Sequence, residues 1–185
     1  LRQGGSLKLH FKTWNNSQQF LPAANGGNID LSIQKAYTRI ANVFCLFSKE
    51  FTDAEKQAGQ LQVNTFNGFD TEETLETFLT VGNEKLPDFP NKGLTEHYWR
   101  LRTRLGVALS LPHSINISYE DFKDDSFVWS AELEAAPMVA SSGMSSQGGQ
   151  ELAIHIKNMI GSSATEIPRR AVVVLHHEII ADILS

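Results

Sequence analysis

Glu151-Leu-Ala-Ile-His-Ile-Lys157 and Ala171-Val-Val-Val-Leu-His-His-Glu-Ile-Ile180 are the two runs that decide the fold. In the first run, apolar residues alternate with mixed ones, which is typical of a strand with one buried face. The second run opens with five apolar residues rich in valine, which predicts a strand covered on both faces. Turn-forming residues fill positions 161–168 between them. We therefore predict a long hairpin at the centre of a sheet.

Upstream segments carry the same β pattern. Apolar and β-branched residues recur at strand-like spacing over residues 7–14, 29–33, 36–47, 61–66, 75–81, 115–119 and 126–133. A helix is the competing interpretation of 36–47, but its aromatic and β-branched residues favour one extended strand, or two with a bulge. About eight to ten strands at this spacing predict an all-β fold, an antiparallel β-sandwich of jelly-roll type.

One short inserted helix is predicted over residues 95–105, with Thr95 as N-cap and Gly106 as C-cap. The segment Leu86-Pro-Asp-Phe-Pro90 before it should be extended, because proline fixes its own φ and biases the preceding residue. The helix also carries three arginines at two-residue spacing, which spreads them around its axis. This spacing favours a solvated face or local salt bridges over an anion site; the residues are Arg100, Arg102 and Arg104.

Length and composition exclude several classes of protein. A chain of 185 residues predicts one domain over residues 1–185. A net charge of −5 argues against a strong nucleic-acid-binding surface, and no apolar run is long enough for a membrane span. The single cysteine, Cys45, excludes an internal disulfide and is expected in the core rather than as a nucleophile. Because the chain begins at Leu1 rather than Met, we expect a fragment or a processed product.

Two clusters contain residue types that can bind metal ions. His176, His177, Glu178 and Asp182 lie in one predicted strand, where adjacent residues point to opposite faces and cannot easily chelate one ion. An acidic group surrounds Phe122 but lacks the spacing of a calcium loop; it contains Glu120, Asp121, Asp124 and Asp125. The remaining histidines carry no ligand spacing: His10, His97, His113 and His155. We therefore predict no metal, no cofactor and no enzyme activity.

Several segments of the second half carry a family resemblance. They are Ile117-Ser-Tyr-Glu-Asp-Phe122, Ser126-Phe-Val-Trp-Ser-Ala-Glu-Leu133, Gly149-Gln-Glu-Leu-Ala-Ile-His-Ile156 and Val172-Val-Val-Leu-His-His-Glu178, preceded by Val81-Gly-Asn-Glu-Lys-Leu-Pro-Asp-Phe-Pro90 and Glu96-His-Tyr-Trp-Arg-Leu-Arg102. Their order resembles jelly-roll virus major capsid proteins, most of all the C-terminal jelly roll of the double jelly-roll capsid proteins of polinton-like and adinto-like viruses. A double jelly roll needs about twice this length. The chain is then either the C-terminal half of a longer capsid protein or a single-jelly-roll shell protein.

The resemblance implies a virion structural protein that self-assembles into the capsid and catalyses nothing. Its partners would be copies of itself, in a trimer or a five- or six-fold capsomer, and other capsid proteins. Aromatic, methionine and arginine side chains are enriched at interfaces. On that ground the candidate interface residues are Phe89, Trp99, Arg100, Arg102 and Met138.

Two other functions are compatible with an all-β sandwich. A carbohydrate- or protein-binding β-sandwich would expose aromatic rings such as those of Trp14, Trp99 or Trp129, although we expect Trp129 in the core. A cupin-like enzyme on the same fold would bring two or more histidines and a carboxylate together inside the barrel, and the spacing of these residue types gives that interpretation little support.

Overall fold

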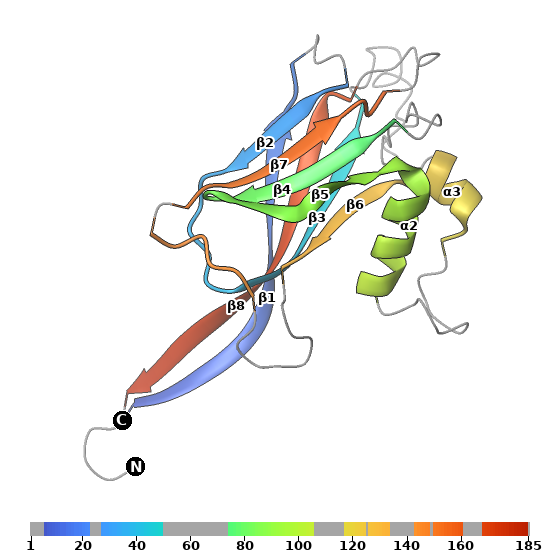
Figure 1. Ribbon diagram of the computed structural model, residues 1–185. Coiled ribbons are helices and arrows are strands. Elements are labelled where there is room, and N and C mark those ends of the chain that lie inside the picture. Colours follow the sequence, from blue (N-terminus) through green and yellow to red (C-terminus); the bar gives the residue numbers. More distant parts are fainter. Residues whose placement is uncertain are drawn as a thin grey trace, which may run out of the picture.

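The computed structural model describes residues 6–22, 27–49, 74–105, 117–124, 126–133, 143–148, 150–160 and 168–184, with side chains from 8 onward and up to 181. Two antiparallel four-stranded sheets face each other (Figure 1). Sheet A has the order β1-β8-β3-β6 and sheet B the order β2-β7-β4-β5. The strands are β1 (Ser6–Phe20), β2 (Ile29–Ile33), β3 (Ile40–Ser48), β4 (Glu76–Val81), β5 (Glu84–Lys92), β6 (Val128–Glu132), β7 (Leu152–Lys157) and β8 (Arg170–Leu184).

This strand order confirms the predicted jelly-roll sandwich. Consecutive strands lie in opposite sheets throughout, except for the hairpin of β4 and β5. The first strand therefore pairs with the last, β2 pairs with β7, and β3 lies next to β8. Such nested pairings are the two Greek keys of a jelly roll.

The predicted C-terminal hairpin is wrong. β7 and β8 are both interior strands, but β7 lies in sheet B and β8 in sheet A, so the connection between them crosses the sandwich. The prediction that Ala171–Leu175 lies between two strands is confirmed by its pairing with β1 and β3. The prediction that both faces of this segment are buried is wrong. Ala171, Val173 and Leu175 are fully buried, whereas Val172 and Val174 between them are half-buried on the outer face of sheet A.

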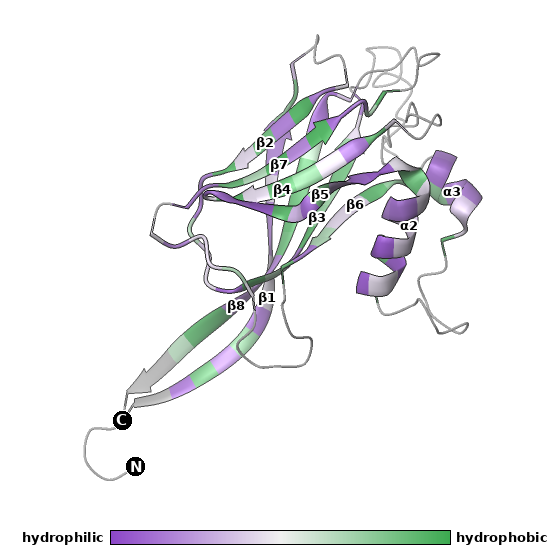
Figure 2. Cartoon of the chain, in the orientation of Figure 1, coloured by the Kyte–Doolittle hydropathy of each residue, from purple (hydrophilic) through white to green (hydrophobic). Residues whose placement is uncertain are grey.

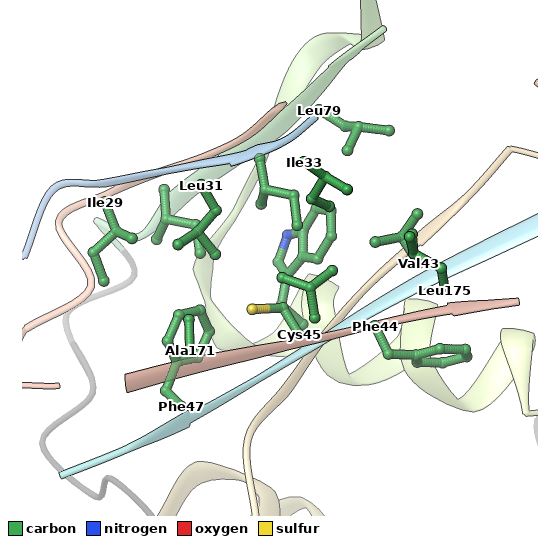
Figure 3. Packing of buried hydrophobic residues seen from close by; sticks show 14 of the residues in the cluster. Ile29, Leu31, Ile33, Val43, Phe44, Cys45, Phe47, Leu79, Ala171 and Leu175 are labelled. Atoms are coloured by element: carbon green, nitrogen blue, oxygen red, sulfur yellow. The ribbon is translucent and has the colours of Figure 1, made fainter. Parts of the chain in front are cut away.

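The core fills the space between the sheets with alternate residues of each strand (Figure 3). Ile29, Leu31 and Ile33 of β2 face Val43 and Cys45 of β3 across this layer. Cys45 is fully buried, as predicted, and this burial raises the pKa of its thiol. Trp129 of β6 pairs with Cys45 and is also buried, again as predicted.

In the described part of the chain two helices, rather than the single one predicted, accompany the sheets. Helix α2 (Gly93–Arg104) confirms the predicted helix and packs against β5 and β6 at one side of the sandwich (Figure 1). Its N-cap is Lys92 rather than Thr95; the Lys92 backbone N–H donates to the Glu96 carboxylate over 2.9 Å. The C-cap is Leu105, and Gly106 lies outside the described residues.

The second helix, α3 (Tyr119–Asp124), corrects the end of the strand predicted over 115–119, of which 115 and 116 lie outside the described residues. The Ser118 hydroxyl oxygen accepts a hydrogen bond from the Asp121 backbone N–H over 3.1 Å, and its hydroxyl donates to the Asp121 carboxylate over 2.6 Å. Such a serine cap favours a helix start over a strand. α3 buries Phe122 against Tyr98 of α2 and Phe127, which explains why this apolar residue lies among acidic ones.

Three other strand predictions have different outcomes. The segment 36–47 is extended only from Ile40, where β3 begins, and its pairing with β8 shifts register between Ile40 and Asn42, as expected of a bulge. The proline segment is confirmed as extended, because it lies inside β5. The strand predicted over 61–66 lies outside the described residues.

The paired strands β1 and β8 continue beyond the sandwich as a two-stranded ribbon (Figure 1). β3 accompanies β8 only as far as His177, so residues 178–184 of β8 pair with residues 6–12 of β1 alone. We call this ribbon the β1–β8 arm. Sheet B does not extend over this ribbon, so its apolar residues are exposed, and Figure 2 shows the hydrophobic stretch on β8. The exposed residues are Leu9, Phe11, Ile179 and Ile180.

Candidate functional site: polar clusters and exposed apolar surfaces

A chain of three polar side chains crosses the outer face of sheet B. The Asp30 carboxylate lies 2.6 Å from Nδ1 of His155, and Nε2 of His155 lies 3.1 Å from the Thr80 hydroxyl. An acid, a base and a hydroxyl in this order also occur in hydrolase triads. However, Thr80 and His155 belong to interior strands, and the backbone N–H groups of these strands are paired in the sheet ladders, so they do not offer backbone donors to an oxyanion. We interpret the cluster as cross-strand stabilisation.

A second polar cluster is buried at the junction of β4, β6 and α2. The Thr77 hydroxyl oxygen accepts the Trp129 indole N–H over 2.8 Å and lies 2.7 Å from Nε2 of His97. Nδ1 of His97 lies 2.5 Å from the Gly93 carbonyl oxygen, which can only accept, so Nδ1 carries a proton and donates it. Each of these buried groups has a partner, so the cluster anchors α2 to the sandwich.

The third cluster surrounds the Glu178 carboxylate at the base of the β1–β8 arm. His10 and Arg39 each donate to it over 2.7 Å, and the Glu178 backbone N–H donates to the Arg39 carbonyl over 3.2 Å. Arg39 has a φ of 47°, an uncommon value for a residue other than glycine. Its two contacts with Glu178 hold this conformation. The cluster therefore fixes the direction in which the arm leaves the sandwich.

Stability should depend on pH through this cluster. Desolvation acts to raise the pKa of Glu178, but the hydrogen bonds from Arg39 and His10 outweigh it and lower that pKa. Since the folded pKa lies below the unfolded value of about 4.3, the contribution is complete above that pH and is lost as pH falls through the folded pKa. Glu178→Gln should be destabilised at pH 7, and its difference from the wild type should shrink below about pH 4.

Urea unfolding at a series of pH values measures this difference. Glu84→Gln, which removes the same charge from an exposed position beside the β4–β5 turn, is the control and should follow the wild type at every pH. A Glu178→Gln deficit that stays constant from pH 7 to pH 3 would show that the carboxylate charge contributes nothing.

The two metal candidates are dispersed. His176 lies on the outer face of β8 with its ring stacked on Trp14 at 4.4 Å, whereas His177 is buried on the opposite face against Tyr37. Glu178 is held as described above, and the Asp182 side chain is outside the described set. In α3, Glu120 forms an ion pair with Lys123, and Asp125 lies outside the described residues. Among the residues that the structure describes, no group of three or more His, Cys, Asp or Glu side chains could hold a metal ion.

The predicted interface residues lie on β5 and α2. Phe89 is 86% exposed on β5 and Trp99 is 54% exposed on α2. Arg100 binds the Glu96 carboxylate through Nε and an Nη at 2.9 and 2.7 Å, which confirms the predicted local salt bridge. Arg102 donates to the Tyr98 hydroxyl over 3.0 Å and lies 5.7 Å from the Trp99 ring centroid. Met138 lies outside the described residues.

A second apolar surface, which was not predicted from the sequence, lies on the outer face of sheet A. Trp14 of β1 is 59% exposed, with its ring stacked on His176 and 5.9 Å from the ring of Phe44. Leu46 and Phe20 are also exposed. The signal in the sequence is that β1 carries apolar side chains on both faces, with Leu9 and Phe11 on one face and Trp14 on the other. A half-buried strand needs apolar residues on one face only.

Any functional assignment for this chain depends on its own residues. Neither a family model nor a curated protein matches the sequence. A membrane-crossing helix is also missing from the described part of the chain, where neither α2 nor α3 is long and apolar enough.

Proposed function

We propose that the chain is a self-assembling subunit of a virus shell and acts through its surfaces rather than through a catalytic site. The observation that carries this proposal is a jelly-roll sandwich with large apolar side chains exposed in several places. Jelly rolls occur in viral capsid proteins, lectins and cupins. The exposed surfaces favour the first of these, because exposed apolar patches on a folded domain mark interaction sites.

The interior of the sandwich gives no support to a cupin-like site. Such a site needs histidines and carboxylates that converge between the sheets. The described residues that face the centre of the sandwich are instead mainly aliphatic and aromatic. The buried histidines, His97 and His177, lie on α2 and β8 and contact Thr77 and Tyr37 respectively.

The surface of β5 and α2 fits a contact between copies. Phe89 and Trp99 are large exposed aromatic residues, a residue type enriched at interfaces. Arg102 lies beside the Trp99 ring and restrains the Trp99 side chain, which lowers the entropy cost of binding a partner. A head-to-tail contact between identical chains closes into a ring when its rotation allows. We therefore propose a cyclic capsomer, either a trimer or a ring of five or six copies, that joins other capsid proteins in the virion.

Trp99→Ala tests this contact. The substitution should weaken assembly and leave the fold intact, because the Trp99 side chain is more than half exposed while the buried face of α2 is unchanged. Hot-spot aromatic residues typically contribute about 2 kcal/mol or more to a contact, so the concentration at half-assembly should rise roughly 30-fold. Sedimentation velocity over a concentration series measures it.

The matched control is Thr103→Ala, a substitution at an exposed position of the same helix, which should assemble like the wild type. If Trp99→Ala and Thr103→Ala both assemble like the wild type, α2 is not part of the contact.

The alternative function is a carbohydrate- or protein-binding module, and one observation favours it. Trp14 presents an exposed ring on a sheet face, next to the amide side chains of Asn16 and Gln18 on the same strand. Aromatic platforms with polar neighbours suit sugar rings. A chain that stays monomeric in the experiment above, but is retained on an oligosaccharide column through Trp14, would support this alternative over the shell.

A further inference from the structure

A shell needs a contact beyond the one that closes a capsomer, and this inference rests on the proposed function. Rings closed through α2 can join only through another surface. The edges of the two sheets are candidates, because an edge strand presents backbone N–H and C=O groups that a further strand can pair with. Among the described strands four lie at sheet edges, which are β1 and β6 in sheet A and β2 and β5 in sheet B.

Three of these edges carry features that protect against pairing. β5 contains Pro87 and Pro90, which cannot donate to a ladder, and α2 packs against both β5 and β6. β6 and β2 are only five residues long. Proline, short length and a covering helix are the usual devices that blunt an edge.

β1 differs from the other three. It runs for 15 residues without proline or glycine, and among the described strands it pairs with β8 alone. It also exposes large apolar side chains along its length, namely Leu9, Phe11, Trp14 and Phe20. The backbone N–H and C=O groups along a long edge of this kind can pair with another strand.

We propose that β1 pairs antiparallel with β1 of a second copy, across a two-fold axis that passes next to Thr13. Two-fold contacts are the commonest between identical chains, and they bring the same patch of both copies together. In full register Ser6 lies opposite Phe20 and Thr13 lies opposite the partner copy's own position 13. The two A sheets then form one continuous sheet.

The charges of β1 favour this antiparallel register. In it, Lys8 lies opposite Gln18 and Lys12 lies opposite Trp14, so no lysine directly opposes another. A parallel in-register pair would set Lys8 against Lys8 and Lys12 against Lys12, and like charges directly opposite are destabilising. The register also keeps the two faces apart: Trp14 stays on the outer face in both copies, while Leu9 and Phe11 stay on the other.

Cysteine cross-linking tests the register in the full chain. Directly opposed residues of an antiparallel pair have Cβ atoms roughly 4.5–5.5 Å apart, close to disulfide range. The chain's single natural cysteine, Cys45, is fully buried. Thr13→Cys should therefore give a disulfide-linked dimer on a non-reducing gel about tenfold faster than Leu9→Cys, whose register partner is Ser17. The double variant Leu9→Cys with Ser17→Cys should cross-link as well, which checks the register independently of position 13.

The outcomes separate this inference from the proposed function. If wild-type chains form particles but Thr13→Cys and the double variant cross-link no faster than Leu9→Cys, the β1 contact is wrong and the shell proposal stands. If both cross-link in a species that stays a dimer at every concentration, the β1 contact is supported and the shell proposal fails.

Discussion

Replacing Val173 with aspartate is expected to lower the free energy of unfolding by about 4 kcal/mol or more, the largest effect of any substitution proposed for this protein. Val173 is fully buried on the inner face of β8, between Ser17 of β1 and Cys45 of β3. An aspartate there places an unpaired carboxylate in the apolar layer between the sheets. The variant should unfold at a much lower denaturant concentration than the wild type, because typical domains have only about 5–15 kcal/mol of stability.

Val172→Asp is the matched control. Val172 is the neighbouring residue of the same strand, but it lies half-buried on the outer face next to Leu46 and Gln18, where water can reach a carboxylate. We expect it to cost about 1–2 kcal/mol. Chemical denaturation followed by circular dichroism compares the two variants. If they unfold at the same denaturant concentration, the assignment of the inner face of β8 is wrong.

Trp129→Ala is expected to have the second largest effect, about 3–5 kcal/mol of unfolding free energy. The Trp129 side chain is fully buried in the core, and its indole N–H is the donor that satisfies the Thr77 hydroxyl oxygen. Truncation leaves a cavity beside β3 and weakens the cluster that anchors α2. The helix should therefore loosen together with the core.

Trp129→Phe separates these two contributions. Phenylalanine keeps most of the ring volume and loses the hydrogen bond, so we expect about 1–3 kcal/mol. Trp99→Ala on the exposed face of α2 is the control and should cost about 1 kcal/mol or less. Thermal unfolding monitored by near-ultraviolet circular dichroism ranks the three variants. A Trp129→Ala variant as stable as Trp99→Ala would contradict the core position of Trp129.

Sequence periodicity predicted the sandwich but not all of its strand partners. The valine run of β8 indicated an interior strand correctly, since β1 and β3 pair with it on its two sides, but it did not show that Val172 and Val174 are only half-buried. The same periodicity holds for any pairing partner, however, so it could not show that β7 belongs to the other sheet. That assignment depends on the nesting of all eight strands, which places β1 and β3 beside β8.

Local polar signals explain the missed helix, and long-range contacts explain the missed clusters. A serine at 118 followed three residues later by an aspartate is a helix-start signal, which was available in the sequence of α3. By contrast, Thr77 bonds His97 and Trp129 across separations of 20 and 52 residues. The apolar side chains on both faces of β1 were a signal of exposed surface in the sequence, but their position at a sheet edge follows only from the topology.

Self-assembly is the central claim, and the native mass of the purified wild-type chain tests it most directly. We predict that multi-angle light scattering at micromolar concentration shows a closed oligomer of three, five or six copies, or larger particles, and that negative-stain microscopy shows discrete rings or shells of uniform size. A chain that stays monomeric at high micromolar concentration across salt and pH would contradict self-assembly.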